Sequence, residues 1–299
     1  MLRSAILAAA DSPRLRRFVD RYGMQLGAAR FVGGETLDDV VVTLRRLNEQ
    51  GLRTNTTLLG ENVADRTEAE QVTSEYGQVL HRIAAEKLQT NVSIKPTHLG
   101  AVLDEELAYA NIERLVAEAG RLGNFIRIDM EDSSLVEPTL RLYRRLRAAG
   151  HDNVGTVLQA YLFRTPEDLE SLLPLGPNLR IVKGAYKELA SIAYPKKADV
   201  DAAYDRLVER CLEGAAFTAV ATHDERRIEK ALALGAGPER MELQMLYGVR
   251  SQLQLDLVHQ GHRVLVATPY GPDWYPYLMR RLAERPANLL FFVRSALDG

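Results

Sequence analysis

Three observations predict an α/β fold built as a (βα)8 barrel. Short β-branched runs alternate with charged, helix-like stretches along the 299 residues. Each kind of segment occurs eight times, which is the number that closes such a barrel. Several of the short runs are apolar throughout, as strands buried on both faces are. A doubly wound sheet is the second possibility, although eight units would be many for it.

The predicted strands begin after residue 52. They are Arg53–Leu59, Asn91–Lys95, Phe125–Met130, Gly155–Ala160, Leu179–Lys183, Phe217–Thr222, Met241–Leu246 and Arg263–Ala267. Helical patterns follow them at Arg66–Lys87, Asp104–Leu122, Pro138–Ala149, Pro166–Leu173, Asp201–Glu213, Glu225–Leu234, Val249–Gln260 and Trp274–Glu284. Start and stop signals agree with these bounds. Thr165 before Pro166 is typical of a helix start, and glycines such as Gly123 follow several helices.

Two further amphipathic helices are predicted before the barrel, near Pro13–Tyr22 and Thr36–Gln50, with Gly33 and Gly34 between them. No low-complexity linker divides the chain. We therefore expect one domain overall, in which residues 1–52 form an N-terminal helical segment and residues 53–299 form the catalytic barrel.

Composition limits the possible partners and compartments. The net charge of −2 indicates no basic surface for nucleic acid. Cys211 is the only cysteine, which excludes an internal disulfide and fits a reducing, cytoplasmic setting. The apolar run AILAAA near the start is too short for a transmembrane segment and short for a signal peptide.

Polar or ionisable side chains stand at the ends of nearly all the predicted strands. Active-site groups of a barrel come from these carboxyl ends, so the set predicts a functional rim. It comprises Glu61, Lys95, Asp129, Glu131, Gln159, Arg180, Lys183, Thr222, His223, Gln244, Tyr247 and the segment 269–271.

Arg280 and Arg281 lie in the stretch YLMRRLAE, which follows the last strand and its turn. Two adjacent guanidiniums can bind one carboxylate bidentately, and Glu284 one turn later can hold Arg280. Arginine pairs at residues 16–17, 45–46, 144–145 and 226–227 show that such pairs also occur on solvated helix faces. The position after a strand end favours a functional role.

The predicted rim carries more positive than negative charge, which suits an anionic substrate or cofactor. Lys95 could be a Schiff-base nucleophile or a point charge for a carboxylate, and its cationic neighbours favour the second role. No histidine or cysteine spacing indicates a metal, and neither GxSxG nor a strand-linked GxGxxG is present. His81 and His259 lie in helical patterns and are assigned structural roles.

From about Leu58 to Asn288 the chain resembles the proline dehydrogenase family, which oxidises L-proline to 1-pyrroline-5-carboxylate with FAD. The resemblance rests on LGE at 59–61, SIK at 93–95, IDMED at 128–132, LQAY at 158–161, RIVKGAY at 180–186, ATH at 221–223, QMLYG at 244–248 and YLMRRLAE at 277–284. It implies the single-function bacterial type, without an aldehyde dehydrogenase domain, and a last barrel helix that lies over the top of the strands.

The resemblance also implies roles for individual residues. FAD would lie across the strand ends with Arg180 near flavin N5; its other contacts would be Gln159, Val182, Lys183, Gly184, Ala185, Thr222, His223 and Glu284. The proline carboxylate would be held by Lys95, Arg280 and Arg281, oriented by Asp129, so that Lys95, Asp129, Arg180, Arg280 and Arg281 form the catalytic set. Tyr186, Leu246 and Tyr277 would shape the slot for the ring, to which we add Tyr270. Glu61 would pair with Arg280 as a gate.

Electrons would pass to a membrane quinone, so a peripheral position at the inner face of the bacterial membrane is expected, and a homo-oligomer is possible. Ala267 departs from the family, which usually has tyrosine two residues before the proline of this motif. We expect the vacated space to widen the range of rings that bind, with 4-hydroxyproline as the candidate, unless Tyr270 or Tyr275 fills it. Two other classes remain open: a Schiff-base aldolase using Lys95 or Lys183, and a non-catalytic barrel that binds an anionic metabolite.

Overall fold

The computed structural model describes residues 28–284, with side chains up to Met279. The predicted helix at residues 13–22 and the side chains of Arg280, Arg281 and Glu284 lie outside this part. Eight parallel strands form a closed barrel in sequence order, because β8 pairs with β1. This closure confirms the (βα)8 prediction and excludes the open, doubly wound sheet.

The strands match the predicted ones closely. They are β1 (Arg53–Leu58), β2 (Thr90–Ile94), β3 (Ile126–Ile128), β4 (Val154–Gln159), β5 (Asn178–Val182), β6 (Phe217–Ala221), β7 (Met241–Leu246) and β8 (Val264–Tyr270). The prediction ended the last strand at Ala267, which was too early. Pairing with β1 continues three residues further, to Leu58 opposite Tyr270.

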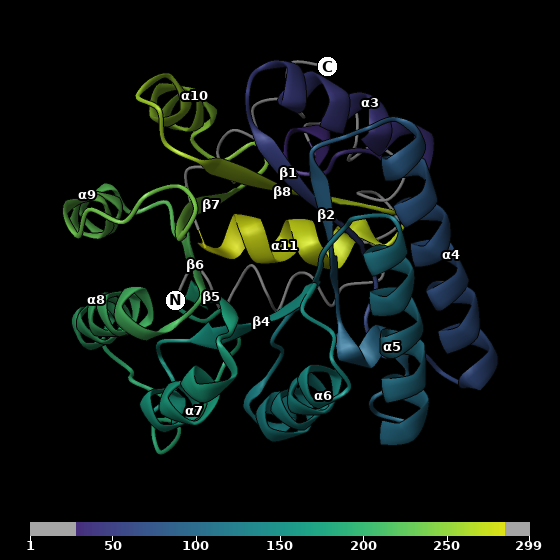
Figure 1. The fold of residues 1–299 in the computed structure, drawn as a ribbon, viewed down its shortest axis with the longest axis horizontal. Helices are drawn as coiled ribbons and strands as arrows, with labels where there is room; N and C mark the ends of the chain where they lie inside the picture. The colour runs from purple at the N-terminus through teal and green to yellow at the C-terminus, as the bar shows by residue number, and fades with distance from the viewer. Residues whose placement is uncertain (1–27, 285–299) are drawn as a thin grey trace.

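Helices separate the strands along the chain, and most of them surround the barrel (Figure 1). They are α3 (Leu37–Glu49), α4 (Arg66–Ala85), α5 (Glu105–Arg121), α6 (Val136–Ala148), α7 (Thr165–Leu172), α8 (Lys197–Gly214), α9 (Glu225–Ala233), α10 (Ser251–His259) and α11 (Trp274–Glu284), with short 3-10 helices at Ala28–Arg30, Pro96–Leu99, Ser133–Leu135 and Leu173–Leu175. Helix α8 begins four residues before its predicted start, and its first turn carries an ion pair from Lys197 to Asp201.

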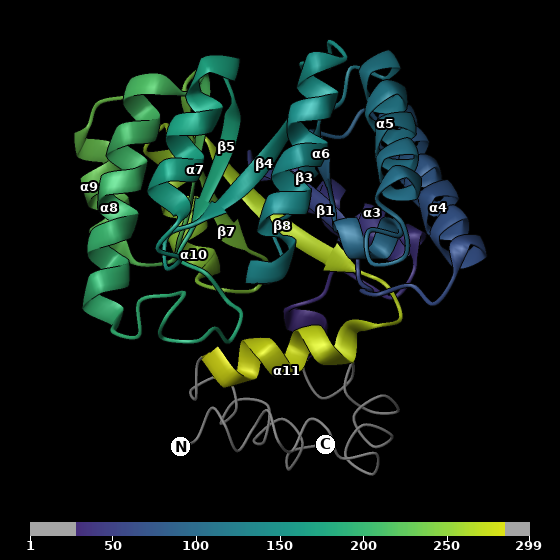
Figure 2. The same ribbon diagram turned by 90° about the horizontal axis from the view of Figure 1, so that it is seen from below.

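Helix α11 does not join the outer ring. Figure 1 shows it across the centre of the ring of strands, and Figure 2 shows it beyond the arrowhead of β8, at the carboxyl ends. The predicted placement of the last barrel helix over the strands is therefore confirmed. None of the helices between Leu37 and Glu284 has both the length and the apolar character needed to cross a bilayer.

Apolar side chains fill the layer between strands and helices, where Ile94, Ile126 and Leu179 are fully buried. The inside of the barrel is polar instead. Arg127 of β3 is 3% exposed and donates to the backbone and side chain of Asn178 on β5. Burial, followed by the nearby charge of Arg180, lowers the pKa of Arg127 to about 9.

A continuous chain of polar contacts runs along the barrel axis. Arg180 donates to Gln244 (2.6 Å), whose amide donates to Glu242 (2.8 Å). Glu242 is 2% exposed and also accepts from Arg263 (2.7 Å) at the amino end of β8. The carboxyl and amino ends of the barrel are thus connected by hydrogen bonds.

Candidate active site

A cavity of about 800 Å³ opens among the carboxyl ends of the strands. The residues to which the resemblance assigns a role, together with Ala267, line it wherever the structure describes their side chains: Glu61, Lys95, Asp129, Gln159, Arg180, Val182, Lys183, Gly184, Ala185, Tyr186, Thr222, His223, Leu246, Ala267 and Tyr277. Tyr277 belongs to α11, so this helix contributes to the same cavity as Lys95 of the β2 end and Arg180 of β5.

Arg180 occupies the floor of the cavity and is held from several sides. Its guanidinium donates to Asp129 (2.7 Å), Gln244 (2.6 Å) and Ser93 (3.2 Å). The Arg180 side chain is 11% exposed and that of Asp129 is 21% exposed. An arginine fixed by three partners presents its charge in one orientation, which suits electrostatic stabilisation of a bound group.

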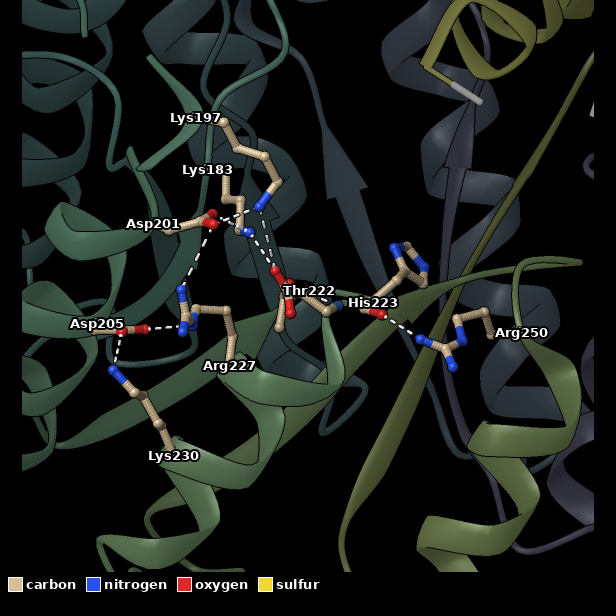
Figure 3. A network of polar contacts seen from close by, with 10 residues as sticks. Lys183, Lys197, Asp201, Asp205, Thr222, His223, Arg227, Lys230 and Arg250 are labelled. Atoms are coloured by element: carbon tan, nitrogen blue, oxygen red, sulfur yellow. Dashed lines mark hydrogen bonds and ion pairs between the residues drawn. The ribbon is translucent and has the colours of Figure 1, made fainter. Parts of the chain in front are cut away.

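Lys183 lies in a network of alternating charges at one edge of the cavity (Figure 3). Its ammonium donates to Asp201 (2.5 Å) and Asp224 (2.9 Å), and Lys197 reaches the same two carboxylates. Burial, the largest single influence, would raise the pKa of both aspartates, but the hydrogen bonds from Lys183 and the charges of Lys183 and Lys197 together outweigh it, and both pKa values are lowered. A nucleophilic amine at Lys183 would have to leave two anionic partners.

His223 and Arg250 order the loops at the β6 and β7 ends. The backbone N–H of Leu246 donates to His223 Nε2 (2.8 Å), so this nitrogen is the unprotonated one. Arg250 donates to the carbonyl of His223 (3.0 Å), as Figure 3 shows. The imidazole thus fixes the position of Leu246, one wall of the predicted ring slot.

Gly184 is required by close packing. Its φ of +114° is disfavoured for any other residue, and a Cβ there would stand 2.2 Å from the ring of Tyr161. The backbone after β5 therefore lies directly against that ring. Gly184 and Ala185 both border the cavity.

Gly184→Ala is expected to destabilise the protein by more than the roughly 1–2 kcal/mol of left-handed strain alone, because the methyl group also collides with Tyr161. Gly235→Ala is the matched control, since Gly235 has φ +73° and open space around its Cβ position. Urea unfolding of both variants gives the comparison. Equal losses of unfolding free energy would contradict the steric argument.

Tyr270 is a correction to the prediction. It does not line the cavity and is 4% exposed in the core. Burial, and next the charge of Glu75 on α4, raise the pKa of its hydroxyl. Tyr275 is also buried, at 3% exposure, and does not border the cavity, so neither tyrosine fills the space beside Ala267.

Several residues of the cavity were missed by the sequence analysis. They are Met130, Val157, Lys197, Ala221, Asp224, Glu225, Arg226, Met245 and Arg250. Most lie at the ends of β6 and β7 or between these strands and the first turns of the helices that follow β5 to β7. The spacing of Lys197 and Asp201, one helical turn apart, was a signal that could have moved the predicted start of α8 back to Lys197.

A closed barrel with a cation-rich cavity at the carboxyl ends of its strands defines an α/β barrel enzyme for an anionic small molecule. A family model described as proline dehydrogenase matches residues 40–294. The chain belongs to the proline dehydrogenase family, a family of oxidoreductases.

Individual relatives agree with this assignment. Proline dehydrogenase 1 of Bacillus subtilis (strain 168) is 41% identical over 301 residues, which cover 99% of both chains. Proline dehydrogenase of Deinococcus radiodurans is 41% identical over 307 residues, covering 100% of this chain and 99% of the relative. Among solved structures, proline utilization A from Bdellovibrio bacteriovorus superposes with a TM-score of 0.80 at 25% identity, over 85% of this chain and 32% of the other.

Proposed function

We propose that the protein catalyses FAD-dependent oxidation of L-proline to 1-pyrroline-5-carboxylate, with a membrane quinone as the final electron acceptor. The observation that carries the proposal is the shared cavity of Lys95, Arg180 and Tyr277. It brings α11, the helix that bears Arg280 and Arg281, to the same opening as the lysine and arginine of the strands.

The hydrogen-bond donors and positive charges around the cavity suit a flavin nucleotide. Basic residues, among them Lys95 and Arg250, border the cavity together with the polar residues Gln159 and Thr222. Gly184, which packs against Tyr161, borders the same cavity. The remaining proposed contacts are Val182, Lys183, Ala185 and His223, together with Glu284 on α11.

In the proposed mechanism, Lys95, Arg280 and Arg281 bind the proline carboxylate and so fix the ring in position. Tyr186, Leu246 and Tyr277 form the apolar walls of the slot. FAD would supply the hydride-accepting ring when bound, and a quinone would be the final electron acceptor. Asp129 anchors Arg180, whose positive charge stabilises negative charge at the reaction centre. Glu61 closes the mouth as a gate with Arg280.

The proposal includes the surroundings of the enzyme. A quinone is lipid-soluble, so the protein works as a peripheral protein at the inner face of the bacterial membrane.

The proposed division of the chain has two parts. Residues 1–52 form the N-terminal segment and residues 53–299 the catalytic barrel. In the described part, α3 of the N-terminal segment packs against β1 and β8.

The absorption spectrum of the purified protein tests the proposal. A flavin spectrum that L-proline bleaches without oxygen, and that a soluble quinone restores, supports it; D-proline serves as the control. A colourless protein that gains no activity from added FAD would refute it. Borohydride trapping of a substrate on Lys95 or Lys183 would indicate the aldolase alternative instead.

A second candidate substrate is suggested by Ala267, which lines the cavity beside its β7 neighbour Leu246. The small side chain leaves room for a ring substituent such as the hydroxyl of 4-hydroxyproline. We expect Ala267→Tyr to lower kcat/KM for 4-hydroxyproline relative to proline by about tenfold, the effect of one group in a filled pocket. If Ala267→Tyr leaves the ratio of the two kcat/KM values unchanged in steady-state assays, Ala267 does not determine ring tolerance.

A further inference from the structure

Thr97 joins two loops of the cavity rim. It lies two residues after Lys95 and is 1% exposed. Its hydroxyl accepts a hydrogen bond from the backbone N–H of Asn62 (3.4 Å), the residue after Glu61. The loop after β1, which carries Glu61, is therefore attached to the loop after β2, which carries Lys95.

Glu131 of the β3 loop anchors Thr97. One carboxylate oxygen accepts from the Thr97 hydroxyl (2.6 Å) and the other from the Thr97 backbone N–H (3.0 Å). The carbonyl of Glu131 accepts from the side-chain amide of Gln159 (2.8 Å) at the end of β4. Thr97 and Glu131 together thus connect the ends of four successive strands, each of which delivers a side chain to the cavity.

Glu131 itself is 3% exposed and does not line the cavity. A buried carboxylate is costly unless it is well bonded, so its retention at this point needs a reason. Burial raises the pKa of Glu131, whereas the two hydrogen bonds from Thr97 and the nearby charge of Lys95 act in the opposite direction. Its contacts are those of an anchor and not of a group that touches substrate.

The β1 loop is also shaped to reach this anchor. Gly60 has φ +150°, and a Cβ there would stand 2.4 Å from Nε2 of His98, the residue after Thr97. Asn62 has φ +56°, an uncommon value for a residue other than glycine. The loop therefore adopts two demanding backbone conformations where it meets the segment Pro96–Leu99.

We propose that Thr97 and Glu131 are positioning residues, which hold the Glu61 loop and Lys95 in their places at the cavity mouth. The kinetic part of this inference rests on the proposed oxidation of proline. Removing the Thr97 hydroxyl frees the Glu61 loop and loosens the segment that follows Lys95. Substrate binding then suffers more than the later chemical step, because Arg180 keeps its own partners.

Thr97→Val and Thr97→Ser are the matched variants, since valine keeps the shape and serine keeps the hydroxyl. Hydrogen exchange of residues 60–64 is the readout that does not depend on the substrate. We expect Thr97→Val to speed exchange there by about tenfold, the effect of about one net hydrogen bond, and Thr97→Ser to stay near the wild type. Equal exchange in all three proteins would overturn the proposal.

Steady-state kinetics with L-proline is the second readout. Thr97→Val should raise KM by about tenfold while kcat falls by less than about threefold, with flavin content unchanged. A fall in kcat at constant KM would overturn the positioning role. If the wild type does not oxidise proline, the proposed function fails, and the exchange measurement alone decides on Thr97.

Glu131→Gln provides an independent check if Thr97→Val does not fold. The amide of glutamine can still accept the Thr97 backbone N–H and donate to the hydroxyl, so we expect KM within about threefold of the wild type. Glu131→Ala removes both carboxylate oxygens to which Thr97 donates, so it should raise KM as much as Thr97→Val does. Similar KM values for Glu131→Ala and the wild type would contradict the proposal.

Discussion

Arg180→Met is expected to lower proline oxidation by at least about 100-fold and to destabilise the fold by about 3 kcal/mol. The loss of rate follows from removing a fixed positive charge at the reaction centre, which typically costs a factor of about 100–1,000. The loss of stability follows because Asp129 and Gln244 lose their partner in a mostly buried site. Breaking a fully buried ion pair costs about 3–5 kcal/mol, and the partial exposure of Asp129 favours the lower end of this range. Activity assays and urea unfolding measure the two effects.

A double variant separates these two effects. Asp129→Asn in the Arg180→Met background removes the unpaired carboxylate, so part of the unfolding free energy should return. Activity should not return, because the charge of Arg180 is still missing. If activity recovered together with stability, Arg180 would be a structural residue and its proposed place beside the flavin would be wrong.

Arg281→Lys is expected to raise KM for L-proline by roughly 5- to 150-fold. The proposed guanidinium binds the carboxylate with two parallel hydrogen bonds, and an ammonium group keeps the charge but not this geometry. A charged hydrogen bond contributes on the order of 1–3 kcal/mol, which corresponds to that range. Steady-state kinetics at saturating quinone gives KM and kcat separately.

Arg145→Lys on α6 is the matched control for this substitution. Arg145 also belongs to an arginine pair, but it forms an ion pair with Glu106 on the exposed face of the helix ring. Its replacement should leave KM unchanged. An unchanged KM in Arg281→Lys as well would argue against the carboxylate role of the pair in α11.

The order and number of the strands could be predicted because each strand has its own recognisable pattern in the sequence. Runs such as Val264–Tyr270 are buried along nearly their whole length, and charged helices with glycine ends separate them. The rim could be predicted for the same reason, since parallel strands place their carboxyl ends together. Once Lys95, Asp129 and Arg180 were assigned to strand ends, their meeting in one cavity followed.

Side-chain direction was the main error. The prediction put Tyr270 in the ring slot, but Ala267 already faces the cavity, and residues an odd number apart on a strand face opposite sides. Because β8 extends to Tyr270, this tyrosine faces away from the cavity. Alternation would have excluded it if the strand had been predicted at its full length.

Contacts between loops could not be predicted. The bonds of Glu131 to Thr97 and of Lys183 to Asp201 join residues 34 and 18 positions apart. Such contacts depend on how each loop turns after its strand, which no local pattern determines. Glu131 was therefore placed on the rim, but without a partner or a role.

The polar line along the barrel axis has a consequence for protein engineering. Arg263 and Glu242 do not line the cavity, yet only Gln244 separates Glu242 from Arg180. Attempts to thermostabilise this scaffold by refilling its lumen with leucine or valine would cut that connection. We expect such variants to have a higher melting temperature but a lower kcat. Engineering for thermal stability should therefore keep the polar residues inside the barrel and vary the outer helices.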